Sequence, residues 1–254
     1  NRLDNIAFVV TSCLKYSDCW PVMMQSIKKY WPAIYEKTYI LTESVGDFHD
    51  DYKFIVLPED RAWSDNLIYL CEQLKGKYDY VFLAMEDGPL IAPIDNKKVN
   101  EYFSTFMEMN GSFLTLLNDP YPSGETVNGL TKISLDSAYR PTTTCALWRL
   151  SKLQDLLVGG ESAWDFEKVG ANRSRNDDNY YSFKKTQIKV FHLVIKGKLF
   201  RNVRRGLAQF DLIYDGDREE LGRFESLKMN AYTLVHRTIF KLTPYKLQKY
   251  LVRK

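Results

Sequence analysis

Two adjacent carboxylates, Glu86 and Asp87, directly follow an apolar run of strand length at 80–85. Mg²⁺ and Mn²⁺ are commonly held by one or two carboxylates together with phosphate oxygens. An acidic pair at the end of a strand is therefore a candidate for holding such a cation against a diphosphate. The structural alternative is an ordinary turn, because Asp-Gly is a common turn dipeptide.

A second candidate is the segment 61–67, where a helical pattern begins shortly after an apolar run. Helix N-termini attract anions through unpaired N–H groups and the helix dipole. An arginine just before such a helix, Arg61, adds charge-assisted hydrogen bonds to a phosphate. The structural alternative is that Ser64 or Asp65 caps the helix and Trp63 packs on the core. The two interpretations are compatible.

Two further segments have the composition of a sugar site. Hydroxyl-rich residues precede the apolar run at 145–148, and Trp164 lies among the carboxylates of 161–167. An aromatic ring can stack on the apolar face of a pyranose, and a carboxylate such as Glu167 can act as general base on an acceptor hydroxyl. The alternatives are ordinary strand composition for the first segment and a charged helix with a buried aromatic face for the second.

The elements that position these residues follow from the apolar pattern. Runs of strand length at 6–11, 38–42, 53–57, 78–85 and 112–117 alternate with helical spacing at 22–31, 64–74 and 95–109. This alternation predicts an α/β domain with a mostly parallel sheet and flanking helices. Ligands in such sheets bind beyond the carboxyl ends of the strands, where Glu86 and Asp87 come.

The second half has more loops. We expect a turn cluster at 119–124, a strand at 142–150, a helix at 151–157, loops or short helices over 161–182, a hairpin at 189–200 and helix beyond 217. We predict one domain over 1–217, divided into two halves at 1–118 and 119–217. Residues 218–254 form a basic helical extension.

Composition excludes several classes of protein. The 254 residues are 45% hydrophobic and 14% aromatic, which excludes a disordered chain, and the net charge of +3 argues against a nucleic-acid binder. The apolar runs are too short to span a membrane. Four cysteines without CxxC spacing and three scattered histidines indicate neither disulfides nor a metal cluster. We therefore expect a cytoplasmic protein.

The C-terminal segment contains no acidic residue after Glu225, whereas seven basic residues follow, interleaved with apolar ones: Lys228, Arg237, Lys241, Lys246, Lys249, Arg253 and Lys254. A basic amphipathic segment of this kind predicts peripheral contact with a membrane, here its inner face. The alternative is a helix that packs back on the domain with a solvated basic face.

Taken in order, these motifs resemble glycosyltransferases of the GT-A type, and among them bacterial surface-polysaccharide transferases. The resemblance spans roughly 6–200 and rests on four segments: 63–67, the strand ending in Glu86-Asp87, 139–148 and 161–167. It implies a Rossmann-related catalytic domain over 1–217 that transfers a sugar from a nucleotide-sugar donor to a saccharide or glycolipid acceptor, with inversion. It also implies that the half at 1–118 binds the nucleotide-sugar and the half at 119–217 binds the acceptor. We expect no nucleic-acid partner.

The resemblance also implies residue roles. The residues implied to bind the donor are Thr11, Ser12, Arg61, Trp63, Asp65, Asn66, Glu86 and Asp87. Acceptor binding falls to Tyr139, Arg140, Thr142, Trp164 and Arg173. Glu167 or Asp165 stands where the catalytic base is expected, and Asp87 with Glu86 where a Mn²⁺ or Mg²⁺ is held.

The acidic motif departs from the family pattern, because it is Glu-Asp-Gly rather than Asp-x-Asp. Arg61, Arg140 or Arg173 is the alternative to a metal for neutralising the diphosphate. Two other functions stay open. A nucleotidyltransferase has a similar sheet and similar acidic metal ligands. It would be expected to have a glycine-rich phosphate-binding loop after the first strand, whereas residues 12–18 contain no glycine. A non-catalytic carbohydrate-binding protein on the same fold is the other.

Overall fold

The computed structural model describes residues 2–243, and within them nine strands form one sheet in the order β3-β2-β1-β4-β8-β5-β9-β7-β6. The strands are β1 (Ile6–Thr11), β2 (Thr38–Thr42), β3 (Lys53–Val56), β4 (Tyr80–Met85), β5 (Phe113–Thr115), β6 (Thr126–Val127), β7 (Leu130–Lys132), β8 (Ala146–Arg149) and β9 (Tyr180–Ser182). Strands β3, β2, β1 and β4 are parallel, and beyond β4 the sheet is mixed.

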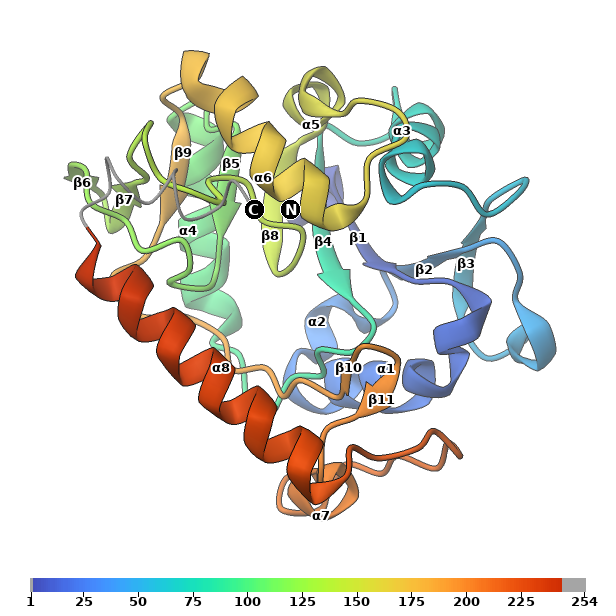
Figure 1. Ribbon diagram of the computed structural model, residues 1–254. Coiled ribbons are helices and arrows are strands. Elements are labelled where there is room, and N and C mark those ends of the chain that lie inside the picture. The colour runs from blue at the N-terminus through green and yellow to red at the C-terminus, as the bar shows by residue number, and fades with distance from the viewer. Residues whose placement is uncertain (1, 244–254) are drawn as a thin grey trace.

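The described residues contain eight α-helices, of which α1 to α6 cover the two faces of this sheet (Figure 1). They are α1 (Trp20–Tyr30), α2 (Pro32–Tyr35), α3 (Trp63–Leu74), α4 (Asn96–Glu108), α5 (Leu150–Leu156), α6 (Ala163–Arg173), α7 (Val203–Ala208) and α8 (Arg223–Leu242). Short 3₁₀ helices are η1 (Arg2–Asn5), η2 (Leu14–Cys19), η3 (Gly46–Phe48) and η4 (Ser174–Asn176), and β10 (Val194–Ile195) pairs with β11 (Lys198–Leu199) in a hairpin.

The alternation of side chains along the strands divides the core into two layers. In β1, Phe8 and Val10 pack with α1, α2 and α4, whereas Ala7 and Val9 face the opposite layer with α3, α5 and α6. All six residues of β1 are buried, as expected for a strand covered on both faces. The predicted α/β class with flanking helices is confirmed.

The crevice for a ligand follows from the strand order. Strand β1 lies between β2 and β4, and its last residue, Thr11, is in register with Met85, the last residue of β4. The chain leaves β1 toward α1 and returns to β2 on one side, whereas β4 lies on the other side. Such a reversal of strand order opens a crevice at the carboxyl ends of the strands.

The second half differs from the expected elements. The strand expected at 142–150 is confined to β8, because Cys145 has a φ of 53°, which is incompatible with extended backbone. The polar segment 161–182 contains α6 and the strand β9, which lies between β5 and β7 in the sheet. Because β8 and β9 join the same sheet as β1–β5, both predicted halves share one core.

No helix within residues 2–243 combines the length and apolarity needed to cross a bilayer. The four cysteines are unpaired. The last predicted part of the tail, residues 244–254, lies outside the described residues.

Candidate active site

A cavity of about 570 Å³ opens at the carboxyl ends of β1 and β4. It collects residues from every chemical segment that the sequence analysis singled out. Nine predicted site residues line it: Thr11, Ser12, Arg61, Trp63, Asn66, Glu86, Asp87, Trp164 and Glu167. The volume matches a small-molecule site.

Glu86 and Asp87 lie where β4 ends, in a tight turn closed by a hydrogen bond from the Gly88 N–H to the Met85 carbonyl (3.2 Å). Glu86 is only 6% exposed. Burial, with the neighbouring Asp87 charge, raises the pKa of Glu86 to about 8. Burial also raises the pKa of Asp87, although His192 opposes the shift. Carboxylates with this little solvation are poised for a cationic or proton-donating partner.

Glu167 lies on α6, which forms another wall of the same cavity. Its Oε1 accepts hydrogen bonds from the backbone N–H of Thr143 (2.8 Å) and from the Thr143 hydroxyl (2.9 Å). Its Oε2 accepts none from the part of the chain that the structure describes. Burial raises the pKa of Glu167, and the hydrogen bonds from Thr143 oppose this shift without cancelling it. A carboxyl group held in this way is positioned for proton transfer.

The start of α3 supplies a third wall. Trp63 lines the cavity and contacts Phe166, with ring centroids 5.1 Å apart. Its buried indole Nε1 has no hydrogen-bond acceptor among the described residues. The Arg61 guanidinium pairs with Glu59, and the Asn66 amide donates to Asp60 (3.2 Å). Thus the helix N-terminus faces the cavity, while the Arg61 charge is shared with an acidic neighbour.

Two predicted carboxylates lie outside the cavity and stabilise the helices around it. Asp165 is exposed and forms a capping box with Ser162 at the start of α6, so its side chain is directed to its own helix rather than to the cavity. Asp65 accepts a hydrogen bond from the Gly160 N–H (3.1 Å), which ties α3 to the turn before α6. This leaves Glu167 as the carboxylate of α6 that faces the cavity.

The four other predicted acceptor residues also lie outside the cavity. Arg173 makes a two-point ion pair with Glu161 (2.7 and 2.6 Å). Tyr139 has a left-handed φ of 52° in the preceding loop, and Thr142 donates to the Thr144 carbonyl (3.5 Å). Thr143 and Thr144, the two residues after Thr142, line the cavity instead.

Arg140 is fully buried, and its two terminal nitrogens donate to the Ser174 and Asp177 carbonyls. Its guanidinium also stacks on the Tyr180 ring, 4.0 Å from the centroid. These contacts join the 137–145 loop to η4 and β9. Arg140 and Arg173 therefore do not supply the charge that the sequence analysis assigned to them as alternatives to a metal.

Arg140→Lys is expected to lower the free energy of unfolding by about 2 kcal/mol, because one ammonium cannot replace the fork that reaches both carbonyls. Urea unfolding measures the change, and the exposed Arg201→Lys is the matched control. Unchanged stability together with a raised acceptor KM would restore the acceptor role of Arg140.

Two charged or titratable cavity residues that sequence reasoning missed, His192 and Lys196, come from the segment before the β10–β11 hairpin and from its turn. Residues 189–193 run antiparallel to 87–91, with the Leu193 N–H donating to the Asp87 carbonyl (2.9 Å). This pairing brings His192 beside Asp87 and places Lys196 on the cavity wall. Lys196 has no ion-pair partner among the described residues. The Lys196-Gly197 turn was recognisable from the sequence. The pairing of 189–193 with 87–91 was not, because the two segments are about 100 positions apart.

The side chains available for a metal are few. Within the described residues, no group of three or more His, Cys, Asp and Glu side chains is arranged to enclose a metal ion. Asp87 and Glu86 together are a donor set that leaves most of the coordination shell to other ligands. Mg²⁺ and Mn²⁺ bound with substrate phosphates accept such an incomplete set, so the residues fit a cation that arrives with a diphosphate.

No protein-family model matches the chain, and no curated protein matches it. Solved structures similar to it include a cytidylyltransferase from Leptospira borgpetersenii (11% identity, TM-score 0.47, 94% of this chain and 98% of that one). Another is Staphylococcus aureus TarS 1–349 (10% identity, TM-score 0.44, 70% of this chain and 60% of that one). A third is Thermus thermophilus mannose-1-phosphate geranyltransferase (10% identity, TM-score 0.44, 74% of this chain and 76% of that one). Similarity at this level assigns no reaction.

Proposed function

We propose that the protein is a glycosyltransferase that moves a sugar from a nucleotide-sugar donor to a hydroxyl of a saccharide or glycolipid acceptor. The observation that carries the proposal is one cavity, at the reversal of strand order, lined by the acidic pair after β4 and by the Thr143-anchored Glu167. Such a crevice accommodates a nucleotide. A second carboxylate on another wall gives a base for the acceptor.

In this proposal the donor nucleotide lies along the β1 loop and the start of α3, near Thr11, Ser12 and Trp63. Its diphosphate lies toward Asp87. Lys196 takes the place of Arg140 and Arg173 as a cation for the leaving group, because it lines the cavity and those arginines do not. A divalent cation held by Asp87, with Glu86, would supply further charge neutralisation to the diphosphate.

The proposed step is a single displacement with inversion. Glu167 accepts the proton of the acceptor hydroxyl as that oxygen bonds to the anomeric carbon. The bond from the anomeric carbon to the diphosphate oxygen breaks, and the nucleoside diphosphate leaves with the electron pair. Fixed charges at the cavity wall stabilise the charge that develops on the leaving group.

The nucleotidyltransferase alternative is less well supported by the β1 loop. Residues 14–19 form the 3₁₀ helix η2, and the loop contains no glycine for a backbone cradle around a triphosphate. A non-catalytic carbohydrate-binding protein would not need a partly buried carboxylate held by two hydrogen bonds at Glu167, so the transferase is the function favoured here.

The proposal is tested by thermal shift with UDP-, GDP-, CMP- and dTDP-sugars, each with and without Mn²⁺. A ligand that binds only the folded state raises the melting temperature by mass action. We expect one nucleotide class to stabilise the protein and to be slowly hydrolysed or transferred. No shift with any of them would reject the proposal, and binding without turnover would favour the non-catalytic alternative.

Trp164 is the proposed contact for the acceptor sugar. It lines the cavity and is 67% exposed, so its ring is available for stacking. Trp164→Ala is expected to raise the acceptor KM by about tenfold, because a lost stacking contact costs roughly 1 kcal/mol or more, and to leave donor affinity unchanged. Steady-state kinetics with varied acceptor measure this. Val169→Ala, exposed on the same helix, is the control, and an unchanged acceptor KM would remove Trp164 from the site.

Peripheral membrane contact is part of the proposal. In α8, Phe224, Leu227, Val235 and Ile239 are exposed, and their spacing places them along one stripe of the helix. With the acid-free sequence after Glu225, this stripe fits an anionic lipid surface. We expect sedimentation with phosphatidylglycerol-containing vesicles but not with phosphatidylcholine alone, and release by high salt. Leu227→Asp is expected to weaken binding to the phosphatidylglycerol vesicles. Equal binding to the two kinds of vesicle, or binding to neither, would contradict the membrane contact.

A further inference from the structure

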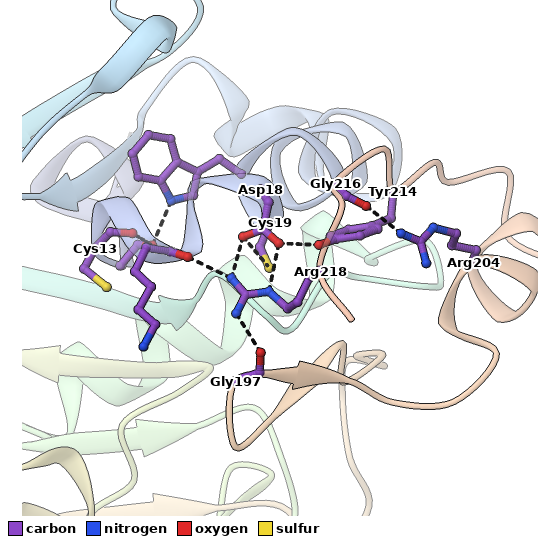
Figure 2. Close-up of polar contacts among 11 residues, drawn as sticks. Cys13, Asp18, Cys19, Gly197, Arg204, Tyr214, Gly216 and Arg218 are labelled. Carbon is purple, nitrogen blue, oxygen red and sulfur yellow. Dashed lines mark hydrogen bonds and ion pairs between the residues drawn. The ribbon is translucent and has the colours of Figure 1, made fainter. Parts of the chain in front are cut away.

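The segment 209–222, which follows α7, returns to the loop after β1. Leu212 and Tyr214 pack in an apolar cluster with Cys19 and Val22, at the junction of η2 and α1. Figure 2 shows the polar contacts that continue from this cluster, with Arg218 at their centre. The segment lies across the boundary that the sequence analysis placed at 217.

Arg218 joins three parts of the chain. Its Nε and one terminal nitrogen donate to the two carboxylate oxygens of Asp18 (2.8 and 2.6 Å). The same terminal nitrogen donates to the Lys15 carbonyl (2.8 Å), and the other donates to the Gly197 carbonyl (3.0 Å) (Figure 2). The guanidinium also stacks over the Tyr16 ring, 4.5 Å from its centroid. The fork of a guanidinium suits these several acceptors, whereas an ammonium does not.

The Arg218–Asp18 pair is well enclosed, with side chains 10% and 22% exposed. Burial opposes ionisation of Asp18, but hydrogen bonds from Arg218 and from the Tyr214 hydroxyl outweigh it and hold the pKa of Asp18 below its usual value. Gly216 lies against this pair, since an added Cβ would be 2.6 Å from the Tyr214 hydroxyl and 2.8 Å from the Asp18 Cβ. The contact is therefore closely packed as well as charged.

The segments that Arg218 joins are both walls of the cavity. Ser12, Cys13 and Tyr16 line it from the β1 loop, and Lys196 lines it from the hairpin turn, directly before Gly197. Arg218 itself does not line the cavity. It therefore fixes the distance between two cavity walls from behind them.

We propose that Arg218 is a positioning residue, which holds η2 and the Lys196–Gly197 turn in the relative arrangement that the ligand in the cavity needs. That this ligand is a nucleotide-sugar rests on the proposed function. The positioning itself rests on the four hydrogen bonds and the ring contact. Arg218 thereby couples the segment before α8 to the cavity.

The first test is hydrogen exchange followed by mass spectrometry on the intact, ligand-free protein. Arg218→Lys keeps the charge but cannot reach all the acceptors, and Gly216→Ala displaces Tyr214 and Asp18 without removing a charge. Both are expected to speed exchange in 12–19 and in 194–199 and to leave α3 unchanged. The controls are Arg223→Lys and Gly222→Ala, since a Cβ at Gly222 meets only the flexible Glu225 carboxylate at 3.4 Å.

Unchanged exchange in either segment of Arg218→Lys would overturn the proposal, and faster exchange throughout would show a general loss of stability instead. A second measurement uses the nucleotide-sugar found by the thermal-shift panel. Arg218→Lys is expected to raise the donor KM about tenfold and to change kcat and the acceptor KM less than about twofold. A fall in kcat with unchanged donor KM would overturn the positioning role. If wild type binds none of the panel, the proposed function fails while the exchange result decides this proposal by itself.

Discussion

Glu167→Gln is expected to reduce kcat by about 10²- to 10⁴-fold, the range that a positioned general base contributes, while donor affinity is retained. Glutamine has nearly the same shape, and its Oε1 can still accept the hydrogen bonds that Thr143 donates to Glu167. The amide cannot accept the acceptor proton. Single-turnover transfer and donor titration, measured on the same preparation, separate the two effects.

Asp165→Asn is the matched control, because this residue is a carboxylate on the same helix that caps α6 instead of facing the cavity. We expect its kcat to stay within about threefold of wild type, since an exposed residue outside the site affects stability more than chemistry. Near-normal turnover in Glu167→Gln, or an equal loss in both variants, would reject Glu167 as the base.

The pH dependence of kcat gives an independent check on Glu167. Burial raises its pKa above the ordinary 4.5, so the base is lost by protonation as the pH falls through a value higher than 4.5. We therefore expect kcat to decline on the acid side with a midpoint above 4.5, and this limb to be absent from Glu167→Gln.

Asp87→Asn is expected to weaken donor binding by about a hundredfold or more in the presence of Mn²⁺. The amide removes the charge that would hold a cation against the diphosphate, and a lost interaction with a charged partner of about 3 kcal/mol corresponds to this factor. Calorimetric titration with the donor, at fixed Mn²⁺, measures the change.

Asp65→Asn is the control for Asp87, because Asp65 accepts a hydrogen bond from Gly160 outside the cavity and an amide oxygen can do the same. We expect its donor affinity to match wild type. If wild type binds and turns over donor equally well in EDTA, the cation has no part in the site. The diphosphate would then be neutralised by Lys196, since the other cavity side chain with a permanent positive charge, Arg61, is paired with Glu59.

The part of the fold that local pattern determines was predictable. Strands β1 to β4 are apolar runs, as expected, and α3 covers the helical pattern expected at 64–74. The cap expected from Ser64 or Asp65 was wrong: α3 begins at Trp63 without a side-chain cap, because Ser64 and Asp65 accept hydrogen bonds from the backbone of Glu161 and Gly160. Since parallel strands end at one edge, the position of Glu86 and Asp87 at the cavity followed from β4 alone.

The second half depends on contacts that the sequence does not display. Arg140 has the composition of a binding residue, but its guanidinium is buried because the Ser174 and Asp177 carbonyls, more than 30 positions later, accept its hydrogen bonds. In α6, both Asp165 and Glu167 were candidate bases from the sequence, with Glu167 preferred. The structure distinguishes their roles, because Asp165 forms the capping box of α6 with Ser162, whereas Glu167 accepts hydrogen bonds from Thr143.

The longest contacts were the least predictable. Lys196 and His192 enter the site through pairing of 189–193 with 87–91, and Arg218 contacts Asp18, 200 positions away. No local spacing encodes such a pair. The basic tail, by contrast, was evident from composition, because the absence of acidic residues after Glu225 needs no partner to be recognised.

A crystal structure of the protein with the donor that stabilises it most in the thermal-shift panel would show where the donor binds. We predict that the nucleotide lies in the cavity at the ends of β1 and β4, with its diphosphate beside Asp87 and the anomeric carbon facing Glu167. A nucleotide bound elsewhere on the molecule, or a diphosphate remote from both carboxylates, would contradict it.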